Sequence, residues 1–244
     1  MAREGGKGKR KWLPLESDPT VFSAYAKALG CKGLAFSDVF GLDVELLAMV
    51  PRPVVAVILL FPIEKKDEAE AELQGESHES GSDATGGDVF YVKQKIGNAC
   101  GTIALLHALA NNQDLVEFEE GSFISTFVRE CQGLSPDEKA DYLDKMAEDG
   151  LESAHNAAAV SDASEGKGEA GKQLSEEEIN TDLHFVCYVE RNGALWELDG
   201  RNPLGTVKLG QCTKEDLLER TAEAIGKRME KSSSLRFNIL AATS

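Results

Sequence analysis

The sequence predicts a single α/β domain in which helices cover both faces of a central, mostly antiparallel sheet, an α/β/α layering. Helical patterns near both ends of the chain, at 18–30 and 213–231, enclose several strand-like segments. The segment 54–61, "VVAVILLF", is apolar throughout and bounded by prolines, which is typical of a strand buried on both faces. With 244 residues, 42% of them hydrophobic, residues 1–244 can bury a sizeable core as one domain.

Local signals place the elements along the chain. Asp18 and Pro19 pair a capping side chain with proline at the first helical position, and Gly30 can end that helix. Ser135 and Glu138 form a capping-box pattern at the start of another helix. Further helices are expected at 43–50, 100–110, 122–131, 135–148 and 213–231, the last capped by Thr213, and strands or extended segments at 34–40, 54–61, 89–94, 183–190, 194–200 and 235–242.

The net charge of −16 is concentrated in two stretches. Residues 64–88 hold nine acids against two lysines, and residues 144–182 hold eleven against three, so the rest of the chain is nearly neutral. Their Gly-, Ser- and Glu-rich composition predicts a mobile acidic insertion at 64–88 and a long loop at 149–180. Nucleic-acid binding needs clustered Lys and Arg, so no nucleic-acid partner is expected.

Composition also bears on compartment. The longest apolar run is too short to span a membrane, and residues 1–11 form a flexible basic tail without the apolar segment of a secretory signal. Five widely spaced cysteines without a CxxC pair predict neither a disulfide framework nor a zinc site. We expect a monomer with no membrane partner in the reducing cytoplasm; the lysines of the tail leave nuclear entry open.

Cys100 stands where a polar, glycine-containing stretch turns into a helix. The exposed backbone N–H groups of a first helical turn favour a thiolate, which is the nucleophilic form of cysteine. The alternative is that Cys100 is an ordinary small buried residue, as most cysteines are. Structural roles are expected for the other cysteines and one histidine, namely Cys31, Cys131, Cys187, Cys212 and His107.

A hairpin supplies the partners that a nucleophile needs. The segments 183–190 and 194–200 are joined by Asn192 and Gly193, a strong hairpin signal. With these two residues in the turn, Asp199 is the diagonal neighbour of His184 on the same face, about 7–8 Å away at the backbone. The carboxylate can then hold one imidazole nitrogen and leave the other for Cys100. A register shift of one residue would separate the two side chains.

Several motifs together resemble the ubiquitin carboxyl-terminal hydrolase family of cysteine peptidases, especially its compact isozymes that consist of the catalytic domain alone. They are Q-x-x-x-N-A-C-G-T at 94–102, "LHF" around His184, "ELDGR" around Asp199, "RKWLPLESDP", "ELLAMVPRPVVAVILLFP", "HALANN" and "LRFN". The resemblance implies a papain-like cysteine-peptidase site and a knotted backbone, one of the exceptions to the rule against knots.

The resemblance also implies a role for each site residue. Cys100 would be the nucleophile, His184 the general base and later acid, and Asp199 the carboxylate that orients the imidazole. Gln94 would stabilise the oxyanion together with the backbone N–H of Cys100. The implied reaction is cleavage after the C-terminal glycine of ubiquitin in small adducts or precursors, through a thioester and without metal or cofactor.

Two alternatives stay open: a protein that holds free ubiquitin with little turnover, and the same chemistry on a ubiquitin-like modifier. In the family, ubiquitin is contacted by an amino-terminal segment, by a loop that crosses over the active site, and by the segment that enters the last strand. Residues 149–180 would be this crossover loop. The matching residues are Pro14, Leu15, Glu16, Ser17, Asp18 and Pro19, then Ala154 and His155, then Leu235, Arg236, Phe237 and Asn238.

Overall fold

The computed structural model describes residues 11–63, 89–161 and 182–244. The predicted acidic insertion at 64–88, residues 1–10 of the predicted basic tail and residues 162–180 of the predicted loop lie outside these ranges. In the described parts of the chain, no helix combines the length and the apolar character that crossing a membrane would require.

The centre of the molecule is a six-stranded sheet in the order β2-β8-β3-β5-β6-β7, and all five pairings in it are antiparallel. Its strands are β2 (Ala35–Asp38), β3 (Val54–Pro62), β5 (Leu183–Arg191), β6 (Ala194–Leu198), β7 (Val207–Gln211) and β8 (Asn238–Thr243). The apolar segment predicted as a buried strand is β3, which pairs with β5 on one side and β8 on the other. Sequence patterns missed β7 and the small sheet of β1 (Cys31–Lys32) with β4 (Glu117–Phe118).

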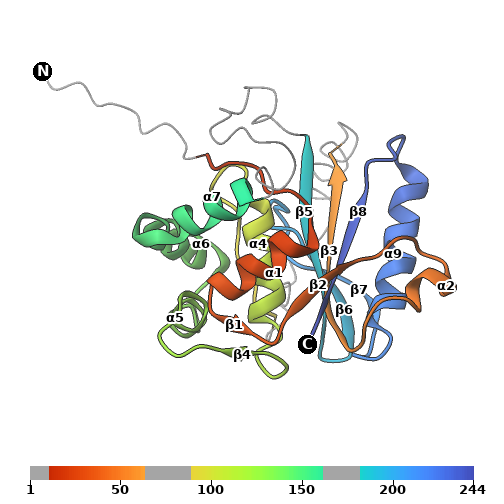
Figure 1. The fold of residues 1–244 in the computed structure, drawn as a ribbon, viewed down its shortest axis with the longest axis horizontal. Coiled ribbons are helices and arrows are strands. Elements are labelled where there is room, and N and C mark those ends of the chain that lie inside the picture. The colour runs from red at the N-terminus through yellow and green to blue at the C-terminus, as the bar shows by residue number, and fades with distance from the viewer. Residues whose placement is uncertain (1–10, 64–88, 162–181) are drawn as a thin grey trace, which may run out of the picture.

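Helices cover both faces of this sheet, as Figure 1 shows, and the predicted α/β/α layering is confirmed. One layer holds α1 (Pro19–Ala28), α4 (Cys100–Ala110), α5 (Phe123–Glu130), α6 (Pro136–Met146), η1 (Ala147–Leu151) and α7 (Glu152–Ser161); the other holds α2 (Val44–Leu47) and α9 (Leu217–Lys231). Side chains of β5 alternate between the layers: Phe185 and Cys187 face the α4 layer, whereas Val186 and Tyr188 face α9. The knotted path implied by the resemblance stays a prediction.

Two of the predicted helix starts are confirmed in detail. The Asp18 carboxylate accepts the backbone N–H groups of Thr20 and Val21 at 2.7 and 3.0 Å and caps α1. The capping box of Ser135 and Glu138 is present at the start of α6. These caps satisfy N–H groups that have no partner inside the helix.

The predicted start of the last helix is wrong. α9 begins at Leu217 instead of 213, with Asp216 in the capping position. Thr213 donates its backbone N–H and its hydroxyl to the Asp216 carboxylate, at 2.6 and 3.0 Å. Thr213 was expected to accept hydrogen bonds as the cap, but it donates them to Asp216 instead. Residues 213–216 therefore form a turn before the helix begins.

The predicted loop at 149–180 is wrong in its first part, because residues up to 161 are helical. Gly150, with φ of 126°, kinks the chain between α6 and α7. Beyond the kink, the alanine-rich sequence of α7 favours a helix. Leu151 and Ala158 are buried in the core of this layer, which holds the helix in place.

The hairpin of β5 and β6 has the predicted register. Val189 pairs with Trp196 and Arg191 with Ala194, which leaves Asn192 and Gly193 in the turn. Both turn residues have positive φ, 53° and 75°, as a type I′ turn requires. This turn fixes which residues of the two strands face each other.

We expect Gly193→Val to destabilise the protein by about 1–2 kcal/mol, since a β-branched residue is strained in the left-handed region. The space around Gly193 is open, so the loss comes from backbone strain and not from a clash. Urea unfolding measures it. Gly193→Asn is the matched control and should lose about half as much or less, because asparagine tolerates this conformation. Equal losses for the two variants would contradict the turn assignment.

Candidate active site

Cys100 is the first residue of α4, a helix that is buried along its length and packs on β5. The residue before it, Ala99, provides no side-chain cap, so the N–H groups of the first turn stay open to an anion. Asn98 turns the chain into the helix with φ of 59° and donates its side-chain amide to the carbonyl oxygen of Trp12 at 3.0 Å. The helix start is thus built to present a thiol.

His184 and Asp199 meet as the hairpin register predicted. His184 Nε2 lies 2.6 Å from Asp199 Oδ1, and only 3% of the histidine side chain is exposed. The same carboxylate oxygen accepts the backbone N–H of Arg201 at 2.8 Å. Because Nε2 faces the carboxylate, Nδ1 is the nitrogen left for the hydrogen bond with Cys100. The structure therefore joins the three predicted side chains in one chain of contacts.

The charged forms of Cys100, His184 and Asp199 stabilise one another. Burial raises the pKa of the Cys100 thiol, but the hydrogen bond and charge of His184 and the N–H groups of Phe185 and Gly101 outweigh it and leave the pKa below its ordinary value. Burial lowers the pKa of His184, yet its bonds to Asp199 and Cys100 raise it to about 9. The arrangement favours a thiolate beside an imidazolium.

The other four cysteines have the opposite environment. All four are buried, and burial raises the thiol pKa to about 11 in Cys31 and Cys131, to about 12 in Cys212, and further in Cys187. Cys100 is partly exposed. It is therefore the one cysteine of the chain with a thiol both accessible and acidified.

The backbone around Asp199 is held from two sides. The hydroxyl of Tyr91 donates to the carbonyl oxygen of Asp199 at 2.7 Å, and the backbone N–H of Gln94 donates to the carbonyl oxygen of Gly200 at 2.8 Å. Gly200 has no room for a side chain: a Cβ there would lie 2.8 Å from Ile103 of α4 and 3.1 Å from Gln94. This close approach packs the loop after β6 against the nucleophile helix and the segment before it.

Gln94 thus lies beside the Asp199 loop. Its side-chain Nε2 donates to the carbonyl oxygen of Ile96 at 3.0 Å, which fixes the orientation of the amide. A primary amide carries two N–H donors, so one remains for an oxyanion. The role of Gln94 as that donor stays a prediction.

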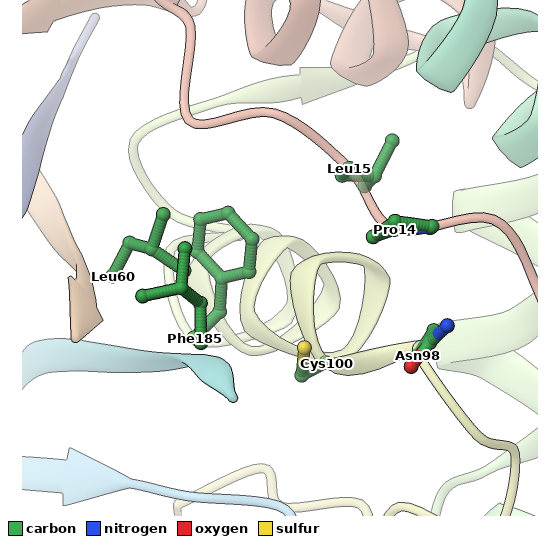
Figure 2. Close-up of a pocket in the computed structure, with 7 residues that line it drawn as sticks. Pro14, Leu15, Leu60, Asn98, Cys100 and Phe185 are labelled. Atoms are coloured by element: carbon green, nitrogen blue, oxygen red, sulfur yellow. The ribbon is translucent and has the colours of Figure 1, made fainter. Parts of the chain in front are cut away.

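A small pocket opens above the thiol of Cys100 (Figure 2). Pro14 and Leu15 form one wall, on the segment that precedes α1, and Leu60 and Phe185 form another, on neighbouring strands. The seven lining residues are Pro14, Leu15, Leu60, Asn98, Cys100, Leu183 and Phe185. A mostly apolar pocket that ends at the Cys100 thiol suits an uncharged, extended chain end.

The family model described as "Ubiquitin carboxyl-terminal hydrolase, family 1" matches residues 12–230. The chain belongs to this family. A ubiquitin carboxyl-terminal hydrolase of Aplysia californica is 41% identical over 224 residues, which cover 91% of this chain and 97% of the relative. Ubiquitin carboxyl-terminal hydrolase 3 of Arabidopsis thaliana is 38% identical over 248 residues, covering 98% and 97%.

The fold is also similar to a solved member of the family. The catalytic domain of Trichinella spiralis UCH37, crystallised bound to ubiquitin vinyl methyl ester, superposes with a TM-score of 0.73 at 27% identity. The match covers 96% of this chain and 95% of that domain. The resemblance inferred from the motifs is therefore confirmed at the level of family and fold.

Two of the segments expected from the family to contact ubiquitin lie side by side. The hydroxyl of Ser17 donates to Asn238 Oδ1 at 2.7 Å, which joins the segment before α1 to the start of β8. Leu235 is 95% exposed next to this junction in sequence, and Arg236 pairs with the Asp182 carboxylate. Pro14, Pro19 and Phe237 are half-buried and Glu16 is exposed, whereas Leu15 is buried against the core.

The third expected contact, in the crossover segment, is wrong for His155. This residue lies on α7, is fully buried, and has both ring nitrogens hydrogen-bonded inside the protein. It has no surface to offer a partner. Ala154, its neighbour, is half-buried and packs against the core on the same helix. The reason is the unexpected helix, which turns these residues inward.

Sequence reasoning missed four residues that line the pocket: Leu60, Asn98, Leu183 and Phe185. Asn98, Leu183 and Phe185 belong to the quoted motifs around Cys100 and His184, so the sequence indicated that they lie near the site but not that they line a pocket. Leu60 belongs to an apolar strand in which nothing distinguishes one residue from the next.

Asp199→Asn should raise the pH at which Cys100 becomes a thiolate. Without the carboxylate, burial lowers the pKa of His184, and the loss of the imidazolium raises the pKa of the thiol. Iodoacetamide alkylation of Cys100 against pH measures the shift, since the acid limb should move to higher pH. Asp141→Asn, which removes an exposed carboxylate paired with Lys95, is the control and should leave the profile unchanged. An unchanged profile in Asp199→Asn would contradict the coupling.

Proposed function

We propose that this chain is a deubiquitinating thiol hydrolase that cleaves the bond after the C-terminal glycine of ubiquitin in small adducts or precursors. The observation that carries the proposal is the contact chain of Cys100, His184 and Asp199 at a small apolar pocket. A solved relative of the same fold is bound to a vinyl methyl ester of ubiquitin, which supports ubiquitin as the partner of this chain.

The first half of the reaction forms a thioester. The Cys100 thiolate attacks the carbonyl carbon of the terminal glycine, and the resulting oxyanion takes hydrogen bonds from the Cys100 backbone N–H and the second N–H of the Gln94 amide. The His184 imidazolium then gives its Nδ1 proton to the leaving amine or thiol. The C–N or C–S bond breaks, and the acyl group stays on Cys100.

The second half releases ubiquitin. Neutral His184 now accepts a proton from water, and the hydroxide attacks the thioester carbonyl carbon. Collapse of the intermediate expels Cys100 as a thiolate, and His184 is again an imidazolium held by Asp199. Both proton transfers take place at Nδ1 of His184, and the 2.6 Å contact of Nε2 with Asp199 keeps that nitrogen directed at the reacting groups.

Ubiquitin contacts fit the surfaces near this site. Pro14, Leu15, Asn98, Leu183 and Phe185 would surround the glycine, because they line the pocket above the thiol. The joined segments that hold Glu16, Ser17 and Pro19 and that hold Leu235 to Asn238 would receive the folded part of ubiquitin. Asp18 supports this surface indirectly, since its carboxylate is used to cap α1.

Release of a fluorophore from the C terminus of ubiquitin tests the proposal. Cys100→Ala should lower kcat by at least about 10³-fold, because the nucleophile is gone, while ubiquitin affinity changes by less than about threefold. Cys131→Ala removes a buried cysteine of the same layer and should retain turnover.

The outcomes separate the open alternatives. Tight ubiquitin binding by the native chain with negligible turnover would point to a protein that holds free ubiquitin. Neither binding nor turnover would redirect the substrate assignment to a ubiquitin-like modifier.

The pH dependence of kcat/KM should be bell-shaped, with its alkaline limb near pH 9. The raised pKa of His184 means that the imidazolium is present below about 9 and is lost above it. The acid limb reports the lowered pKa of Cys100, and both limbs belong to the coupled pair. A rate that still rises between pH 9 and 10 would instead indicate a free thiolate that acts without the ion pair.

A further inference from the structure

His155 is a buried, fully bonded histidine that the proposed reaction does not use. None of its surface is exposed. Its Nδ1 lies 2.7 Å from the Thr102 hydroxyl, its Nε2 lies 2.6 Å from the carbonyl oxygen of Leu13, and its ring packs 4.5 Å from the Trp12 ring. A buried polar side chain held this closely has a defined partner for each atom.

The direction of these hydrogen bonds follows from their chemistry. The Leu13 carbonyl can only accept, so Nε2 carries the hydrogen. Burial lowers the pKa of His155 to about 4, so the ring is neutral at pH 7 and Nδ1 must accept. Thr102 therefore donates to His155, and the hydroxyl of Tyr25, 3.0 Å away, donates to Thr102. The hydrogen bonds therefore run in one direction, from Tyr25 to Thr102, from Thr102 to His155, and from His155 to the Leu13 carbonyl.

This series of hydrogen bonds links two sides of the cleft over Cys100, which contains the small pocket described above. Thr102 stands in the first turn of α4, two residues after Cys100. Leu13 directly precedes Pro14 and Leu15, which form the wall over the thiol. In Figure 1 the segment before α1 runs beside α7, the helix that carries His155. One imidazole thus holds the wall with one nitrogen and the nucleophile helix with the other.

Other contacts also join the wall to that helix and to the turn before it. Leu15 rests on Gly101, where a Cβ would come within 2.8 Å of its side chain. Trp12 is bonded to the turn before the helix: its N–H donates to Gly97 at 2.9 Å, and its carbonyl accepts from Asn98 at 3.0 Å. Because the wall lies outside helices and strands, its position depends on such individual bonds.

We propose that His155 is a positioning residue that fixes the separation between the cleft wall at 13–15 and the first turn of α4, and so sets how tightly the C-terminal end of ubiquitin is held over Cys100. The inference rests on the proposed function. It gives His155 a role in ubiquitin affinity that requires burial, in place of the direct contact expected from the sequence.

Two substitutions separate the two bonds of His155. Asparagine can accept from Thr102 near the position of Nδ1 but is too short to reach Leu13, whereas glutamine can reach Leu13 and leaves Thr102 without its acceptor. We expect His155→Asn to raise KM for a ubiquitin–fluorophore substrate about tenfold, the effect of one lost buried hydrogen bond, with kcat within about threefold. His155→Gln, which keeps the wall attached, should raise KM by no more than about threefold.

A merely structural role would give a different pattern. Ile225→Ala is the matched control, since Ile225 is buried on α9 in the other layer and should destabilise the fold without reaching the cleft. All variants are assayed below their melting transitions. If His155→Asn raises KM no more than Ile225→Ala or His155→Gln does, the inference is overturned.

A second readout keeps this inference separable from the proposed function. NMR signals of the Leu15 methyls and the Gly101 amide report the wall and the helix turn without any substrate. They should shift in His155→Asn and stay in place in Ile225→Ala. Unshifted signals in His155→Asn overturn the inference whatever the enzyme does. A native chain that does not turn over ubiquitin refutes the proposed function instead, and the NMR signals alone then decide the role of His155.

Discussion

The register of the β5–β6 hairpin is the constraint on which the rest of the site depends. It brings Asp199 to 2.6 Å from His184, and a shift of one residue would turn one of the two side chains to the opposite layer. β5 also pairs with β3, where Phe61 stands opposite His184 with its ring edge against the imidazole at 5.9 Å. The imidazole is therefore held by Phe61 of β3 on one side and by Asp199, which follows β6, on the other. These two contacts orient the ring independently of Cys100.

Three adjacent charged groups in the interior are tolerable only because each charge has a partner. His184 is almost fully buried, and an unpaired imidazolium there would revert to its neutral form. Asp199 keeps 22% of its side chain exposed, so solvent and the Arg201 N–H share the cost of its charge. The same environment separates Cys100 from the other cysteines: burial raises the pKa of every thiol, and only at Cys100 do the hydrogen bond and charge of His184 and nearby backbone N–H groups outweigh burial.

Sequence reasoning succeeded where a local rule determined the geometry. Asn192 and Gly193 favour a two-residue type I′ turn, which predicted the register and with it the His184–Asp199 contact. It failed where the composition of a long segment hid a local preference: residues 149–180 are rich in Gly, Ser and Glu as a whole, but their alanine-rich first part forms α7 and packs on the core. His155 is the clearest case, because its match to the crossover segment of the family indicated a contact with ubiquitin, but whether its ring faces ubiquitin or Thr102 depends on how α7 packs.

The wall of the cleft shows why buried polar side chains gather around this site. An irregular segment has no ladder to satisfy its backbone, so each buried carbonyl needs a donor from elsewhere. The carbonyl of Trp12 takes that donor from Asn98, at the turn into the nucleophile helix, and the carbonyl of Leu13 takes it from His155. A strand paired within a sheet would form these hydrogen bonds with its neighbouring strand and would need no side-chain donors. Because the segment is irregular, its own hydrogen-bonding requirement ties the wall to the catalytic helix.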